Sequence, residues 1–271
     1  MSNLGMTIFR PGCHMVSMGD GISIFPPKGG AAANGLLNNL IAYWPGNEVA
    51  GNALDLHVNA LHLTDTNTVT SNPGLSYPLA RQYTALNNEY HTRPGDDALL
   101  SVGVGIDFTM AVCHYLDSKP AGQMHAACKW AGGGNQRAYT LWWNNLLDRL
   151  EFTVSSTGAA AGNTSINNNS LGAPVLGTWY LTVVWHDATA GRIYIQTNDG
   201  AIDSVGHAGG VFDNTAAFGV GSQGGIACWD GRIGATMFWK SAAGLGGVKT
   251  PAERLALWNG GVPLTYAAFT V

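Results

Sequence analysis

Histidine and serine are the residues of this chain that most directly suggest metal-dependent or nucleophilic chemistry. His57 and His62 lie five positions apart. The other histidines occur singly, among them His114, His125, His186 and His207. A zinc site needs three or four closely placed ligands, so this spacing favours structural histidines with hydrogen-bond partners over metal ligands. No G-x-S-x-G sequence places a serine on the sharp turn that a hydrolase nucleophile occupies.

Oxygen-bearing side chains occur in two loops. Asp96 and Asp97 follow a Pro-Gly turn, and Asp213 and Asn214 follow an aromatic residue. Calcium binds hard oxygen donors in loops, so these four residues are the calcium candidates of the sequence. The favoured alternative is a pair of solvated turns, and no other cofactor is indicated.

Three aromatic residues form a candidate sugar platform. Trp142 and Trp143, with Tyr139, could stack on the C–H face of a sugar ring. Adjacent residues of a strand point to opposite faces, so one tryptophan is expected in the core and at most one on the surface. Packing is the favoured role for these side chains, and glycan binding is the alternative.

Strands must position these side chains. Alternation at residues 179–186, turn residues at 187–191 and renewed alternation at 192–197 predict a long antiparallel hairpin with a buried face. Residues 108–116 also alternate, and they predict a central strand that is covered on both faces. Residues 158–172 are almost entirely Ala, Gly, Asn, Ser and Thr, and they predict an exposed loop.

The C-terminal part carries the one good helical signal. Thr250 is suited to the N-cap, Pro251 to the first helical position, and Glu253 completes a capping box before a Gly-Gly stop at 260–261. About a dozen short strands precede this helix. The pattern predicts an all-β, two-sheet antiparallel jelly-roll sandwich over residues 36–271, with one short C-terminal helix.

Residues 1–35 differ in character from this sandwich. They contain prolines, a Gly-Gly pair and a run of three alanines, as linkers do. They also contain apolar side chains that a solvated linker does not need: Ile8, Phe9, Ile22, Ile24 and Phe25. A flexible tail and an extended arm that becomes ordered against a partner are equal alternatives.

The composition excludes several classes of partner. Only 11% of the 271 residues are charged, the net charge is -4, and 13 Lys and Arg residues supply no basic stripe for nucleic acid. Neither a signal peptide nor a run of about 18 apolar residues is found, so no membrane span is expected. The four cysteines are far apart, which favours buried free thiols over a disulfide framework.

A set of short motifs occurs along the chain in this order: Tyr43-Trp44, Gly51-Asn-Ala-Leu-Asp55, Leu61-His-Leu-Thr64, Ile106-Asp-Phe-Thr109, Lys129-Trp130, Asn135-Gln-Arg137, Thr178-Trp-Tyr180, Trp229-Asp-Gly-Arg232 and Thr250-Pro-Ala-Glu253. Together they resemble the laminin-G-like group of concanavalin A-like lectin and glucanase domains, of the kind found in phage virion proteins. The similarity spans roughly residues 40–261. The resemblance implies a flat and a curved sheet, with sugars or proteins bound at the concave face and edge loops, often beside calcium.

Two departures from this family limit what the resemblance implies. Gly234-Ala235 stands where such domains commonly carry an acidic pair after the Trp-Asp-Gly turn. Glycosidases of the superfamily need closely spaced carboxylates, because hydrolysis takes an acid and a base or nucleophile about 5 to 10 Å apart. The four glutamates, at 48, 89, 151 and 253, form no E-x-D-x-x-E pattern, so no enzyme is expected.

These observations favour a non-enzymatic structural or surface-display protein, a phage capsid-decoration or tail-associated component of the virion. Its partners would be other virion proteins, held through the arm of residues 1–35. It would form a homo-oligomer at the virion surface. The alternative is a lectin-like module that recognises cell-surface glycans, and a divergent glycan hydrolase is the third hypothesis.

Overall fold

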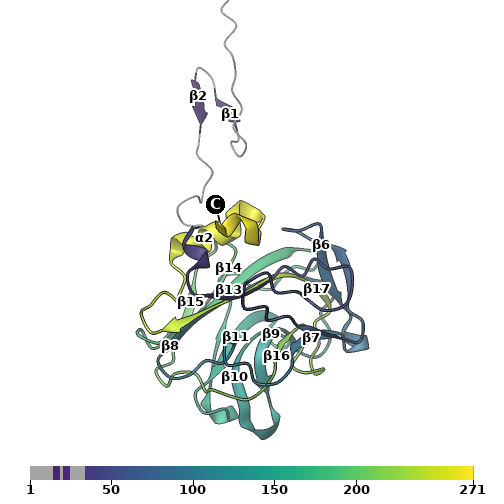
Figure 1. Cartoon of the computed structure of the whole chain (residues 1–271), viewed down its shortest axis with the longest axis vertical. Helices are drawn as coiled ribbons and strands as arrows, with labels where there is room; N and C mark the ends of the chain where they lie inside the picture. Colours follow the sequence, from purple (N-terminus) through teal and green to yellow (C-terminus); the bar gives the residue numbers. More distant parts are fainter. Residues whose placement is uncertain (1–14, 19–20, 25–33, 271) are drawn as a thin grey trace, which may run out of the picture.

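A computed structural model describes residues 15–18, 21–24 and 34–270. The strands β1 (Met15–Met18) and β2 (Gly21–Ile24) pair with each other. Ile22 and Ile24 of the expected arm lie in β2, whereas Ile8, Phe9 and Phe25 lie outside the described residues. Residues 34–270 fold into a sandwich of two antiparallel sheets (Figure 1).

One sheet has seven strands. Their order across the sheet is β12 (Asn163–Asn167), β11 (Arg149–Ser155), β10 (Gln136–Asn144), β9 (Met124–Ala131), β16 (Phe218–Val220), β7 (Tyr90–Arg93) and β4 (Thr64–Thr66). β9 to β12 follow one another in the sequence, whereas β16, β7 and β4 come from distant parts of the chain.

The other sheet has eight strands, of which seven form one path. Their order is β15 (Asp203–Gly206), β14 (Arg192–Thr197), β13 (Trp179–Asp187), β8 (Ile106–Leu116), β17 (Gly231–Ala242), β6 (Leu79–Tyr83) and β5 (Thr70–Pro73), with β3 (Leu40–Trp44) also paired to β17. The expected hairpin is confirmed as β13 and β14, and the expected central strand as β8.

The main core lies between the two sheets. Phe108 of β8 and Phe238 of β17 meet Tyr139 of β10, with ring centroids 5.0 and 5.5 Å from the tyrosine. Inward-facing residues of every long strand join this core because side chains alternate along a strand. Burial of this apolar surface is the main force that holds the sheets together.

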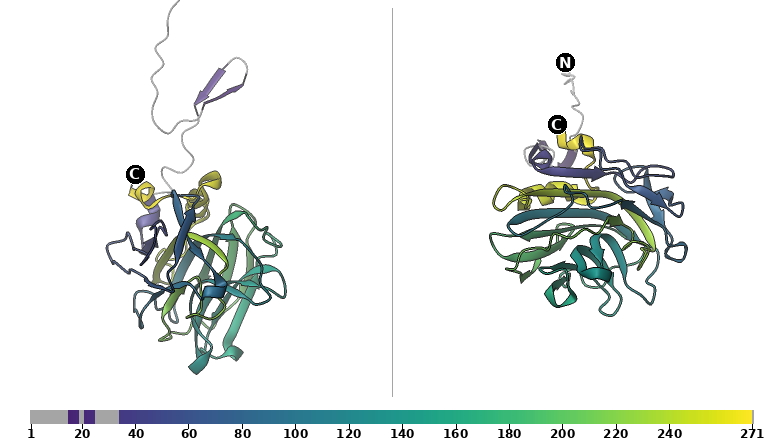
Figure 2. Two further views of the ribbon diagram at one scale, coloured as in Figure 1. Left: turned by 90° about the vertical axis from the view of Figure 1, so that its right-hand side faces the viewer. Right: turned by 60° about the horizontal axis from the view of Figure 1, so that its bottom comes forward.

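A second apolar layer covers the outer face of the eight-stranded sheet. It consists of η1 (Asn34–Leu37), α2 (Pro251–Trp258) and η6 (Tyr266–Thr270), packed on Trp185 and Trp239. The Trp239 indole of β17 donates to the Leu36 carbonyl of η1 at 2.7 Å. η1 also contacts η6, so the beginning and end of the sandwich lie side by side (Figures 1 and 2). This sheet is therefore buried on both faces, which leaves the outer face of the seven-stranded sheet open.

The capping residues of α2 act as the sequence predicts. The Thr250 side chain accepts from the Glu253 backbone N–H, and the Glu253 carboxylate accepts from the Thr250 backbone N–H at 2.7 Å. Pro251 begins the helix as expected. The helix ends at Trp258 with Asn259 as the left-handed C-cap, so it stops before the expected Gly-Gly pair at 260–261. No helix among the described residues is both long and apolar enough to cross a membrane.

The expectation of one exposed loop over residues 158–172 is wrong in part. Residues 163–167 form β12, the edge strand of the seven-stranded sheet, paired in register with β11. The strand was not predicted because its side chains show no apolar alternation, and its stability comes from backbone pairing with a neighbour. This error matters for function, because β12 forms one wall of the candidate site.

Three of the cysteines agree with the expected role. Cys113, Cys128 and Cys228 are buried free thiols, and burial raises the pKa of Cys113 and Cys128 to about 12. Such thiols are poor nucleophiles because the reactive form is the thiolate. Cys13 lies outside the described residues.

Candidate functional site

Strand alternation divides the residues of β10 between the core and the open face of the sheet. Tyr139, Leu141 and Trp143 belong to the core, whereas Thr140 and Trp142 lie on the outer face. The expectation that one of the two adjacent tryptophans is buried and one faces outward is confirmed. Trp142 is therefore positioned by the periodicity of its own strand.

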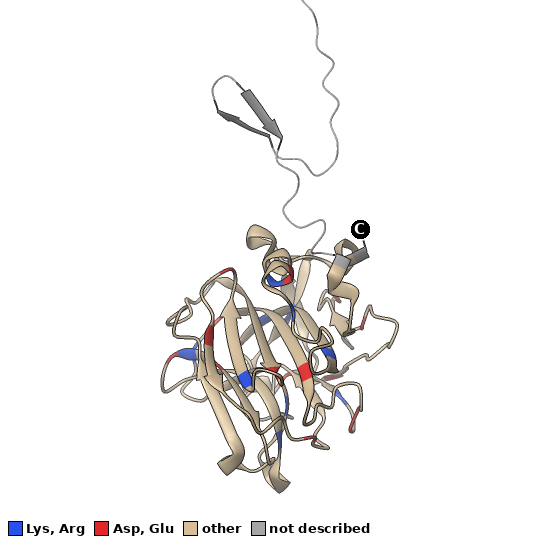
Figure 3. Cartoon of the chain, turned by 90° about the vertical axis from the view of Figure 1, so that its left-hand side faces the viewer, with Lys and Arg blue, Asp and Glu red and all other residues tan. Residues whose placement is uncertain are grey.

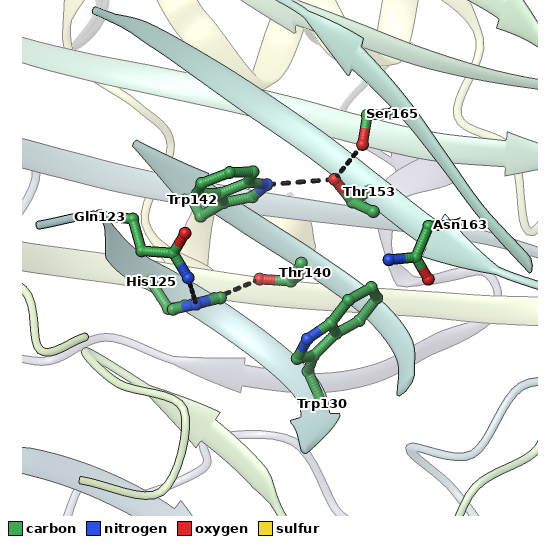
Figure 4. Close-up of a pocket in the computed structure, with 8 residues that line it drawn as sticks. All are labelled: Gln123, His125, Trp130, Thr140, Trp142, Thr153, Asn163 and Ser165. Carbon is green, nitrogen blue, oxygen red and sulfur yellow. Dashed lines mark hydrogen bonds between the residues drawn. The ribbon is translucent and has the colours of Figure 1, made fainter. Parts of the chain in front are cut away.

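Trp142 lines a cavity of about 190 Å³ on this outer face. The lining side chains come from β9, β10, β11 and β12 and from the residue just before β9 (Figure 4). They are Gln123, His125, Trp130, Thr140, Trp142, Thr153, Asn163 and Ser165. The lining thus combines two indole rings with amides, hydroxyls and one imidazole, and it contains no charged residue.

Thr153 organises one wall of the cavity. Its hydroxyl donates to Glu151 Oε1 at 3.1 Å and accepts from the Trp142 indole N–H at 3.1 Å. The Ser165 hydroxyl lies 2.7 Å from the same oxygen. Since the proton of Thr153 is directed at the carboxylate, Ser165 donates to Thr153 and keeps its own oxygen free to accept from a ligand.

His125 forms the floor beside Trp142. The two rings are stacked, with centroids 6.0 Å apart and an interplanar angle of 18°. Burial lowers the pKa of His125 to about 4, so the imidazole is neutral near pH 7. Gln123 Nε2, which can only donate, lies 3.4 Å from His125 Nε2. His125 Nδ1 therefore carries the proton and donates to Thr140 Oγ1 at 2.6 Å.

Several polar groups of the lining are available to a ligand. In the described part of the chain, no protein group is hydrogen-bonded to the indole N–H of Trp130 or to the side-chain amide of Asn163. The hydroxyl proton of Thr140 is also free, because this oxygen accepts from His125. A ligand would meet donors and acceptors beside the faces of aromatic rings, which is how sugar hydroxyls and C–H groups are bound.

The structure corrects the set of aromatic candidates. Trp143 and Tyr139 are buried and serve packing, with their polar atoms bonded to Asp148 Oδ1 at 2.9 Å and to the Leu100 carbonyl at 2.8 Å. Trp130 was missed as a platform residue. The register of β9 against β10 shifts at a point between His125 and Trp130. Because of this shift, Ala126 and Ala127 both lie in the core. Simple alternation from His125 therefore does not indicate the face of Trp130.

Two of the four calcium candidates converge on a lysine. The Lys129 ammonium donates to Asp96 Oδ1 at 2.9 Å, to Asn214 Oδ1 at 3.1 Å, and to the carbonyls of Asn214 and Ala216, both at 2.7 Å. The ammonium is almost completely buried, and its hydrogen bond is the main reason that the pKa of Asp96 is lowered. The protein's own cation therefore occupies this oxygen cluster, and a calcium ion would have to displace it.

The other two candidates lie apart from this cluster. Asp97 pairs with Arg93 at 3.0 Å and caps the turn that follows it through the Leu99 backbone N–H. Asp213 is exposed. Among the described residues, no group of three or more His, Cys, Asp or Glu side chains is arranged to hold a metal ion. Calcium binding stays a prediction of the sequence.

Charge is sparse over the whole sandwich. Figure 3 shows single Lys, Arg, Asp and Glu positions separated by long uncharged stretches of ribbon. The ion pair of Lys119 with Asp148 at 2.7 Å joins the loop after β8 to the turn between β10 and β11. The candidate site is thus uncharged within a surface of low charge.

Comparisons with known proteins identify the fold. No family model matches the chain, and no curated protein matches it. Among solved structures, domain 4 of a GH43 extracellular arabinanase from Geobacillus stearothermophilus, solved in complex with arabinotriose, is 14% identical with a TM-score of 0.58. This match covers 80% of the present chain and 97% of the arabinanase domain.

Two toxin domains are similar as well. The binding domain of Paraclostridial Mosquitocidal Protein 1 is 12% identical, with a TM-score of 0.62 over 82% of this chain and 52% of that one. The ligand-binding domain of botulinum neurotoxin serotype D, in complex with N-acetylneuraminic acid, is 7% identical, with a TM-score of 0.58 over 85% and 53% of the two chains. The chain thus spans about half the length of each toxin chain. These likenesses confirm the expected all-β jelly-roll sandwich.

Proposed function

We propose that this protein is a non-catalytic carbohydrate-binding module whose site is the outer-face cavity around Trp142. The observation that carries the proposal is the position of the Trp142 indole beside neutral, preoriented hydrogen-bonding groups in a cavity of about 190 Å³. Sugars offer apolar C–H faces for stacking and hydroxyls for hydrogen bonds, and this lining is complementary to both.

The similar structures support this proposal. The arabinanase domain was solved with arabinotriose, and the serotype D toxin domain with N-acetylneuraminic acid. The match covers 97% of the arabinanase domain, which therefore holds carbohydrate on a β-sandwich of the same general fold, whereas it covers 53% of the toxin chain. The present chain shares their fold at low identity, so its own ligand must be argued from its own residues.

The arrangement of carboxylates is the reason for proposing binding without catalysis. Glycoside hydrolysis requires two carboxyl groups on either side of the scissile bond. No Asp or Glu side chain lines the cavity, and the nearby Glu151 carboxylate accepts hydrogen bonds from Asn144 Nδ2 at 2.7 Å and Thr153 Oγ1 at 3.1 Å. Glu151 is thus one buried carboxylate with its oxygens already engaged.

A glycan array followed by calorimetry tests the proposal. The full-length protein is expected to bind at least one carbohydrate, and Trp142→Ala is expected to weaken that binding about tenfold or more. Trp179→Ala is the matched control, because Trp179 is a half-buried indole of the other sheet, with its ring centroid 5.3 Å from that of Tyr115. Binding that is absent for every carbohydrate, or equally reduced by both variants, would refute the assignment.

The virion interpretation stays a prediction of the sequence. It depends on an arm within residues 1–35, whose side chains lie outside those that the structure describes, and the similar structures above give it no support. Capsid partners, homo-oligomer formation and a virion-surface location are likewise predictions of the sequence. A carbohydrate site on the sandwich is compatible with such a display role.

A further inference from the structure

A second cavity lies next to the first on the outer face of the seven-stranded sheet. Its volume is about 300 Å³, and its lining is mostly glycine and alanine, with Thr92, Gln223 and the exposed Ile226. Trp130 lines both cavities. The strand order places Thr92 on β7, Gly219 on β16 and Trp130 on β9, so the second cavity continues the first across neighbouring strands.

The two cavities together run across the strands. They extend from Ser165 on β12 to Thr92 on β7, which are six neighbouring strands of one sheet. Adjacent strands are about 4.8 Å apart, so the combined length is about 24 Å. In Figure 4, Trp130 and Trp142 lie at opposite sides of the first cavity, with Asn163 and Thr140 near Trp130. A surface of this length and composition is suited to several sugar rings in a row.

Neither lining contains a charged side chain. The ionised group that is hydrogen-bonded to a lining residue of the first cavity is the Glu151 carboxylate, through Thr153 at 3.1 Å. At the second cavity, the Lys129 ammonium donates to the backbone carbonyl of the lining residue Ala216 at 2.7 Å. An acidic sugar in the first cavity would therefore meet no cation and would lie near a buried negative charge, which is unfavourable. The nearby Arg137 directs Nη1 to the Gly158 carbonyl at 3.3 Å, and its Nη2 approaches Gly132 at the edge of the second cavity.

We propose that the two cavities form one groove, with Trp130 as the shared platform, and that this groove selects a linear, uncharged oligosaccharide and rejects sialylated or uronic-acid glycans. The inference rests on the proposed carbohydrate-binding function and specifies its ligand. Among the similar proteins, the serotype D toxin domain is named with a sialic acid. The neutral lining of the present groove points away from that class of sugar.

Calorimetric titration of the full-length protein tests the inference. The probes are the hexasaccharides of arabinan, xylan, cellulose, mannan and amylose, the corresponding monosaccharides, and two acidic probes, sialyllactose and trigalacturonate. At least one neutral hexasaccharide is expected to bind about tenfold or more tightly than its monosaccharide, and Trp130→Ala is expected to weaken it about tenfold. The two acidic probes are expected not to bind.

Two variants obstruct the second cavity alone. Ala217→Trp changes an exposed lining residue. Gly133→Trp changes a lining glycine whose added Cβ would meet nothing within 4 Å, so the fold is expected to tolerate it. Either variant should abolish the tighter binding of the hexasaccharide relative to its monosaccharide. The affinity for the monosaccharide should stay unchanged. Leu146→Trp adds the same side chain at a position that is 86% exposed and lines neither cavity, and it is the matched control.

The outcomes separate the two proposals. If a monosaccharide binds as tightly as its hexasaccharide and both obstructing variants have no effect, the extended groove is wrong while the carbohydrate-binding function stands. If sialyllactose or trigalacturonate binds at Trp142, the selection for uncharged ligands is wrong and the function again stands. If no glycan binds the wild-type protein, both proposals fail together.

Discussion

Lys129 and Asn214 hold each other through a reciprocal set of hydrogen bonds. The lysine ammonium donates to the Asn214 carbonyl at 2.7 Å and to its Oδ1 at 3.1 Å, and Asn214 Nδ2 donates back to the Lys129 carbonyl at 3.1 Å. This pair links the strand that carries Trp130 to the segment that precedes β16 and carries Ala216, a residue of the second cavity. The ammonium therefore performs the ordering role that an ion performs in many loops.

Replacing this ammonium should destabilise the fold. We expect Lys129→Met to lower the free energy of unfolding by about 2 to 3 kcal/mol, because the buried carbonyls of Asn214 and Ala216 would lose their donor. Asp96 is 42% exposed at its side chain and can be hydrated instead. Urea denaturation of both proteins measures the difference.

The control for this prediction is Lys119→Met. Lys119 forms an ion pair with Asp148, but the two side chains are 23% and 41% exposed, so the loss should be about 0 to 1 kcal/mol. Calcium and a chelator should both leave the unfolding temperature of the wild-type protein unchanged, since Lys129 occupies the oxygen cluster. A rise in that temperature with calcium would contradict this account.

Stability should decrease with acid before the carboxylates titrate. Burial lowers the pKa of His91 to about 4, of His114 to about 3 and of His125 to about 4, from an ordinary value of 6.5. The unfolded chain therefore takes up protons first as the pH falls below 6.5, and stability that is fully present above this pH is lost. Each histidine should contribute roughly 2 kcal/mol of loss between pH 7 and pH 5.

Denaturant unfolding at a series of pH values measures this effect, and the slope reports the number of protons taken up. His114→Gln should flatten the slope, because it removes one of the three groups. Stability that stays constant down to pH 5 would show that these histidines are not titrating as their burial requires.

The ring and the N–H of Trp142 should contribute unequally to binding. Trp142→Phe keeps an aromatic face beside His125 but loses the donor to Thr153. We expect a loss of about threefold in affinity for Trp142→Phe and about tenfold or more for Trp142→Ala, since stacking carries most of the contact. Calorimetry with a carbohydrate identified on the array measures both. Equal losses would mean that the N–H, through Thr153, matters more than the ring.

The arm should be dispensable for folding. Among the described residues, both apolar clusters begin at Leu36 or later. A protein without residues 1–33 is therefore expected to keep its unfolding temperature, since the packing that stabilises the sandwich is retained. Light scattering coupled to size-exclusion chromatography should show an oligomer that becomes a monomer on deletion. A truncated protein that unfolds, or that keeps the same oligomeric state, would contradict the predicted role of the arm.

Part of the candidate site was predictable from local patterns. Alternation along residues 138–143 requires that Trp142 and Trp143 face opposite sides, and the structure confirms this with Trp143 in the core. The contribution of Asn163 and Ser165 was not predictable, because a polar edge strand has no periodic apolar signal. Trp130 was missed because a register shift in β9 interrupts the alternation that would show its face.

The amino-acid sequence by itself determined the class of the fold, the hairpin at 179–197 and the capped helix that begins after Thr250, because periodicity and capping depend on near neighbours. Only the tertiary structure decided that Trp130 and Trp142 share a cavity, and that Lys129 meets Asn214 from 85 positions away. Those contacts depend on which strands pair across the sheet, and this choice is set by the packing of the whole core.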